Sequence, residues 1–90
     1  MRKASELPPS KSRDKGRETL GDPELARKLL ELRRKYGLNQ EQVAGEVKVS
    51  RPSLVGYETG ATMPTVFTLA RLAAFYDVTL DELAGHLKPA

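Results

Sequence analysis

Residues 37–60 read GLNQEQVAGEVKVSRPSLVGYETG, and this stretch predicts two short helices joined by a tight turn. Asn39, followed three residues later by Gln42, has the pattern of a capping box, which places the first helix at about residues 40–47. The second helix is expected over about residues 50–59, where apolar residues again repeat at helical spacing before a glycine. Two short helices joined this closely form a helix-turn-helix.

The flanking sequence predicts three more helices. Asp22 and Pro23 are typical of a helix start, and the apolar spacing after them predicts a helix over about residues 23–36. Thr65 caps a helix that ends by Asp77, and Thr79 opens a capping box for the last one. No strand pattern is present. The expected fold is therefore all-α, a compact bundle of five short helices.

Length and composition set the class of protein. Ninety residues with 39% hydrophobic content and no tryptophan leave room for one small aliphatic core. No cysteine is present, which excludes disulfides, thiolate nucleophiles and cysteine-based zinc sites and fits a reducing compartment. The first twenty residues lack the apolar run of a signal peptide or a membrane span. We expect a cytoplasmic protein without a membrane partner.

Charge and composition divide the chain into two parts. Residues 1–21 carry six basic and three acidic side chains and few large aliphatics, which predicts a flexible basic arm. This arm either solubilises the chain or grips DNA. Residues 22–88 form the predicted domain, in which basic residues outnumber acidic ones before residue 58 and the reverse holds after it. This asymmetry favours contact of one end with a polyanion.

Residues 32–85 resemble the phage repressor and Cro type of helix-turn-helix, the XRE family of DNA-binding regulators. The resemblance is carried by four motifs in order, which are Gly37-Leu38-Asn39-Gln40-Glu41-Gln42-Val43-Ala44, Val49-Ser50-Arg51, Tyr57-Glu58-Thr59-Gly60 with Pro64 after it, and Val78-Thr79-Leu80-Asp81-Glu82-Leu83. It implies a five-helix bundle that binds double-stranded DNA in a sequence-specific manner, often as a homodimer.

The resemblance also implies which residues face the DNA bases. The first two positions of the second helix of the motif and one a turn later correspond to Arg51, Pro52 and Gly56. Arg51 is the candidate for direct readout, because a guanidinium can donate two hydrogen bonds to guanine; the alternative is a phosphate contact. Pro52 and Gly56 offer only van der Waals contact. DNA shape then carries part of the specificity, or this helix binds protein. Pro52 also allows a register in which Arg51, rather than Ser50, caps the helix.

Further residues are candidates for contacts with the phosphate backbone. By the resemblance, Asn39 and Gln40 present a side chain and a free amide from a helix N-terminus, which attracts phosphate. Capping alone would also explain Asn39. The other candidates are Lys48, Ser50, Ser53 and Thr62.

Two further sets of residues have other expected roles. Arg33 and Glu58 correspond to a shielded ion pair in the family, and we interpret them as structural. Phe67, Arg71 and Phe75 are spaced by four, which predicts exposed phenylalanines on the helix after Thr65. A dimer interface is expected at four residues, Phe75, Leu80, Leu83 and Leu87. The alternative is that the last helix or the arm covers the phenylalanines.

Enzymatic activity is not expected. His86 is the only histidine and lacks a nucleophile, an oxyanion loop or a glycine-rich phosphate cradle, and one histidine without cysteine makes a poor metal site. We therefore predict no cofactor and no metal. The rival hypothesis is an XRE-type protein-interaction module, such as an antitoxin or a transcriptional bridging factor with a protein partner.

Overall fold

Every α-helix begins after a polar residue whose side-chain oxygen accepts a hydrogen bond from the backbone N–H three residues on, which satisfies a donor that the helix leaves open. The capping residues are Asp22, Asn39, Ser50, Thr65 and Thr79. They start α1 (Pro23–Lys35), α2 (Gln40–Val47), α3 (Arg51–Thr59), α4 (Val66–Phe75) and α5 (Leu80–Ala84). Two 3₁₀ helices, η1 (Ala4–Glu6) and η2 (Gly85–Leu87), lie near the two ends of the chain.

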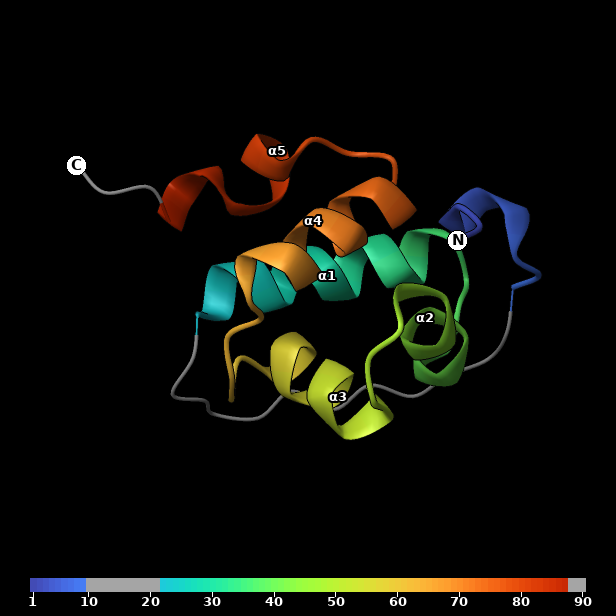
Figure 1. Cartoon of the computed structure of the whole chain (residues 1–90), viewed down its shortest axis with the longest axis horizontal. Helices are drawn as coiled ribbons and strands as arrows, with labels where there is room; N and C mark the ends of the chain where they lie inside the picture. The colour runs from blue at the N-terminus through green and yellow to red at the C-terminus, as the bar shows by residue number, and fades with distance from the viewer. Residues whose placement is uncertain (10–21, 88–90) are drawn as a thin grey trace.

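The computed structural model describes residues 1–9 and 22–87. Within these ranges the secondary structure is entirely helical, so the predicted all-α, five-helix architecture is confirmed. Figure 1 shows α3 along one edge of the molecule and α5 along the opposite edge, with α1 and α4 between them. Helix α1 packs against α3 and α5, and α4 packs against α2 and α5.

The turn between α2 and α3 depends on a left-handed residue. Lys48 ends α2 with φ 61° and ψ 48°, a conformation that is unfavourable for a residue with a Cβ. Ser50 then caps α3, and Pro52 occupies the second helical position, where no backbone donor is needed. The register in which Arg51 is the cap is therefore wrong, and Arg51 is the first residue of the helix.

The core is aliphatic, with two aromatic residues at its centre. Phe75 and Tyr76 are both buried and their rings meet edge to face at 5.0 Å. The buried hydrophobic residues around them come from every α-helix and from the N-terminal segment. These are Ala4, Leu7, Leu25, Leu29, Leu38, Val43, Ala44, Val47, Leu54, Leu69, Leu72, Ala73 and Leu83.

Residues 1–9 correct the expectation of a flexible arm. Ala4 and Leu7 are buried in the core cluster, and Arg2 Nη2 pairs with Glu46 Oε2 of α2 at 2.6 Å. Figure 1 shows this segment beside α2, near the end of α1. A short 3₁₀ turn is enough to bring two apolar side chains three residues apart onto one face, and the small bundle gains core from them. Residues 10–21, the rest of the predicted arm, lie outside the described residues.

The expected exposure of the α4 phenylalanines holds for only one of them. Phe67 is 77% exposed, whereas Phe75 is fully buried, and Leu83 of α5 is buried as well. Helix α4 is covered on more than one side, because it packs against both α2 and α5, and Phe75 belongs to the common core cluster. Phe75 and Leu83 therefore hold the bundle together and have no surface to offer a second copy of the chain.

Helix length is short throughout. No helix formed by residues 1–9 and 22–87 combines the length and the hydropathy that a membrane span requires. The longest, α1, has 13 residues, of which four are buried, and one of the buried residues is an arginine.

Candidate nucleic-acid interface

The start of α3 presents its outer face to solvent. Arg51 and Pro52 are exposed, whereas Leu54 and Glu58 on the opposite face are buried. Val55 and Gly56 are partly exposed and lie about one turn further on, so that the accessible face extends along the helix. An exposed helix face of this kind, on a helix anchored from behind, has the shape that fits a major groove.

Arg51 is held loosely in the free protein. Its Nη1 lies 3.6 Å from Glu41 Oε1, and both side chains are more than half exposed. Exposed ion pairs of this kind contribute about 0–1 kcal/mol, so the guanidinium can leave Glu41 at little cost. The pair shows that the first turns of α2 and α3 share one surface, and the sequence interpretation did not predict the contact with Glu41.

The amino end of α2 is built by a capping box. Asn39 Oδ1 accepts from the Gln42 N–H at 2.8 Å, and Gln42 Oε1 accepts from the Asn39 N–H at 2.9 Å. Gln42 Nε2 also donates to the carbonyl of Pro8 at 2.8 Å, which ties the N-terminal segment to this corner. The Asn39 side chain therefore caps α2, which was the alternative to a phosphate contact for this residue.

Gln40 is linked to a buried ion pair behind the exposed face of α3. Arg33 Nε donates to Glu58 Oε2 at 2.8 Å, with side chains 0% and 2% exposed, and Arg33 Nη1 donates to the Leu38 carbonyl at 2.9 Å. Gln40 Nε2 donates to the other Glu58 oxygen at 3.2 Å. The network joins α1, the loop before α2, α2 itself and α3, and thus fixes the relative orientation of the two helices of the motif.

Tyr76 lies next to this network in the core. Its hydroxyl is buried and has no hydrogen-bond partner in the part of the chain that the structure describes. Burial raises the pKa of this phenol, and the negative charge of Glu58 raises it further. The ring stacks against Tyr36 at 6.3 Å, so the side chain contributes packing while its hydroxyl is costly to bury.

The remaining polar candidates lie around the turn and the start of α3. Ser50 Oγ accepts from the Ser53 N–H at 3.2 Å and donates to Ser53 Oγ at 2.8 Å, so the two hydroxyls are engaged with each other. Lys48 is exposed in the turn. These residues are close in sequence to Arg51 and lie at the same end of α3.

Gly56 and Thr62 make a close approach further along α3. A Cβ built on Gly56 would meet the Thr62 hydroxyl oxygen at under 3.0 Å, and the Thr62 N–H donates to the Gly56 carbonyl at 3.2 Å. Thr62 is exposed in the loop that follows α3. The sequence placed both residues near DNA but gave no sign that they touch.

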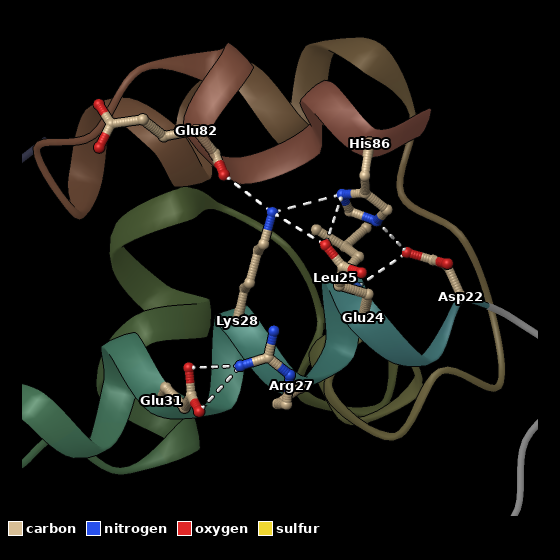
Figure 2. A network of polar contacts seen from close by, with 8 residues as sticks. All are labelled: Asp22, Glu24, Leu25, Arg27, Lys28, Glu31, Glu82 and His86. Carbon is tan, nitrogen blue, oxygen red and sulfur yellow. Dashed lines mark hydrogen bonds and ion pairs between the residues drawn. The ribbon is translucent and has the colours of Figure 1, made fainter. Parts of the chain in front are cut away.

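A second cluster of charges lies at the start of α1, away from α3. His86 Nε2 is 2.6 Å from Asp22 Oδ2, and Lys28 Nζ lies 3.4 Å from Glu24 Oε2 and donates to the Glu82 carbonyl at 3.1 Å (Figure 2). The hydrogen bond from His86 lowers the pKa of the Asp22 carboxyl. The cluster includes the Lys28 ammonium, and its contacts join His86 of η2 and the Glu82 carbonyl of α5 to the start of α1. We therefore interpret it as a structural link between the two ends of the domain. No set of residues suited to a metal ion occurs among the described residues.

Exposed apolar side chains gather between α4 and α5. A groove of about 430 Å³ is lined in part by Val66, Leu80 and Leu87. All three are exposed, and Phe67 adds a further exposed ring near the start of α4. Of the four residues expected at a dimer interface, only Leu80 and Leu87 have accessible surface.

Comparison with known proteins gives a consistent result. A family model described as helix-turn-helix matches residues 29–83. The chain is 39% identical over 59 residues to the HTH-type transcriptional regulator DdrOP3 of Deinococcus deserti, which covers 66% of this chain and 46% of that protein. It is also 39% identical over 58 residues to the cryptic phage CTXphi transcriptional repressor RstR of Vibrio cholerae, covering 64% and 52%. The chain thus spans about half the length of these curated relatives.

Solved structures show the same similarity. The restriction-modification controller protein C.AhdI from Aeromonas hydrophila superimposes with a TM-score of 0.64 at 30% identity, over 68% of this chain and 92% of that one. A transcriptional regulator from Listeria innocua gives a TM-score of 0.65 at 30% identity, over 73% of this chain and 62% of that one.

Proposed function

Because the chain belongs to the XRE-type helix-turn-helix family, we propose that it is a transcriptional regulator that binds double-stranded DNA in a sequence-specific manner. The observation that carries this proposal is the exposed Arg51 at the first position of α3, on the same surface as the amino end of α2. In the proposed complex, α3 enters the major groove and Arg51 contacts a guanine through O6 and N7.

Phosphate contacts come from the surroundings of α3. The amino end of α2 carries backbone N–H groups and the positive end of a helix dipole, both of which favour a phosphate. Gln40, whose side chain is tied to Glu58, supplies a further donor at this end, and Lys48 supplies a charge in the turn. The alternative for Arg51 is a backbone contact, in which its guanidinium leaves Glu41 and pairs with a phosphate.

Base contacts from α3 itself are few, and this affects the expected mode of specificity. Pro52 has no polar side-chain atom and Gly56 has no side chain, so the helix offers one strong hydrogen-bonding side chain among its three base-facing positions. We therefore expect the shape and deformability of the DNA to contribute to the choice of site.

We further propose that two copies bind an inverted repeat. The exposed apolar groove between α4 and α5 would be covered by the same surface of a second copy, as in a two-fold symmetric interface. Two recognition helices would then lie ~34 Å apart and contact successive turns of one face of the DNA. Leu80→Lys tests this, because a charge in the groove should give a monomer by light scattering where the wild type is a dimer. A wild type that stays monomeric with and without DNA contradicts the dimer.

The DNA-binding proposal is tested by selection from a pool of random duplexes. We expect the wild-type protein to enrich an inverted motif that contains guanine in each half. Arg51→Ala should lose the guanine preference while its melting temperature stays unchanged, because the side chain is exposed. A pool without enrichment, together with no binding at low salt, contradicts the proposal and favours the protein-interaction module, for which exposed Phe67 would be the expected contact.

A further inference from the structure

The glycine in the middle of α3 calls for a physical explanation. Gly56 lies inside the helix and has ordinary helical geometry, since its φ is not among the positive values. Glycine at such a position destabilises a helix by about 1 kcal/mol relative to alanine, so its backbone freedom is of no use there. Another feature of the structure must favour the absence of a side chain.

Thr62 supplies that feature. A Cβ on Gly56 would collide with the Thr62 hydroxyl oxygen, while the Thr62 Cβ and Cγ2 would lie at ordinary contact distances of 3.5 and 3.6 Å. The Thr62 N–H also donates to the Gly56 carbonyl at 3.2 Å, which fixes the loop against the helix. The hydroxyl of Thr62 thus occupies the place where a side chain of residue 56 would begin.

We propose that Thr62 is a specificity-determining residue, whose hydroxyl makes from the loop the base contact that α3 lacks at Gly56. This inference rests on the proposed function. A hydroxyl can donate to and accept from base edges, and the adjacent methyl group can contact a thymine methyl. Thr62 is exposed and lies over the base-facing side of α3, which favours a base edge over a flanking phosphate.

The position of the contacted base follows from helix geometry. Gly56 lies five residues after Arg51, which corresponds to about 7.5 Å along the helix axis. With α3 lying along the groove, this distance equals about two base-pair steps of ~3.4 Å. Thr62 should therefore affect base preference about two base pairs away from the guanine that Arg51 contacts.

The test compares base preferences of variants by selection and by competition binding to duplexes changed at single positions. Thr62→Val keeps the shape and removes the hydroxyl, and we expect it to lower discrimination at one base pair roughly 2- to 12-fold, as for the loss of one hydrogen bond. The preference at the Arg51 position should stay as in the wild type. A variant with the wild-type motif overturns the inference, and so does an equal loss of affinity for all duplexes with a shallower salt dependence, which indicates a phosphate contact.

A second pair of variants tests the role of Gly56. Gly56→Ala should displace Thr62 and lower both the melting temperature and the same base preference. Gly56→Ala combined with Thr62→Ala should restore the melting temperature, because the Cβ then meets only the Cβ at 3.5 Å, but should leave the preference lost. A double variant that melts as low as Gly56→Ala overturns the inference. If the wild type selects no motif at all, the proposed function fails first and this inference fails with it.

Discussion

Removal of Glu58 is expected to weaken the fold and the DNA-binding surface together. Glu58→Ala takes away the carboxylate that accepts from Arg33 Nε at 2.8 Å and from Gln40 Nε2 at 3.2 Å, at a place where both charged side chains are at most 2% exposed. Arg33 keeps its hydrogen bond to the Leu38 carbonyl but loses the Glu58 carboxylate as its partner. Breaking a buried pair in this way costs ~3–5 kcal/mol.

The expected effect on melting is large for a domain of this size. A loss of ~3 kcal/mol lowers the melting temperature of a 60- to 100-residue domain by about 12 °C or more. Circular dichroism melting of the wild type and Glu58→Ala measures this, with Glu41→Ala as the control, since the exposed Glu41–Arg51 pair contributes ~1 kcal/mol at most. Arg33→Met with Glu58→Leu should recover most of the lost stability, because neither charge then stays buried alone.

DNA affinity should fall with Glu58→Ala, since the pair sets the angle between α2 and α3. A Glu58→Ala variant that melted within about 4 °C of the wild type would refute the structural role of the ion pair. Loss of affinity without loss of stability would place Glu58 in the DNA contact and not in the scaffold.

Four other predictions follow from the contacts described above. Leu7→Ala should cost ~2–5 kcal/mol, because the side chain is buried in the core, and chemical denaturation without a shift of the midpoint would contradict the docked N-terminal segment. Lys48→Gly should raise the free energy of unfolding by about 1 kcal/mol, because glycine adopts the left-handed conformation without strain. Its DNA affinity should fall, because a positive charge is lost. A lower melting temperature would contradict the first expectation. Tyr76→Phe should leave stability unchanged or raise it by up to ~1 kcal/mol, because it removes a buried hydroxyl without a described partner, and a clear loss would reveal a partner for it. The hydrogen bond from His86 lowers the pKa of Asp22, so this contact stabilises the fold above pH ~3.9 and its contribution is lost as the pH falls further. The difference in melting temperature between the wild type and His86→Ala should therefore narrow below pH ~4. A difference that widens there would contradict this prediction.

Local chemistry explains which parts of the fold were predictable. The caps at Asp22, Asn39, Ser50, Thr65 and Thr79 act within three residues, so the start of each helix follows from nearby sequence. For α2 the predicted bounds and the observed ones agree. Helix α5 ends at Ala84 and the chain continues as η2.

Features that depend on distant parts of the chain were not predictable. A helical wheel of α4 alone suggests that Phe75 is exposed, but α4 packs against both α2 and α5 and the ring is fully buried. Leu7 is likewise buried in a core that is formed by helices distant from it in the sequence. The contact between Thr62 and Gly56 depends on the path of the loop after α3, for which the sequence holds no periodic signal.

The most direct test of the account is an amide titration of the nitrogen-labelled protein with duplex DNA at low salt. We predict that the signals of Gln40, Arg51 and Gly56 shift first and furthest, while those of α5 move little. Unmoved signals across α2 and α3 at saturating duplex would contradict the claim that α3 enters a groove of DNA.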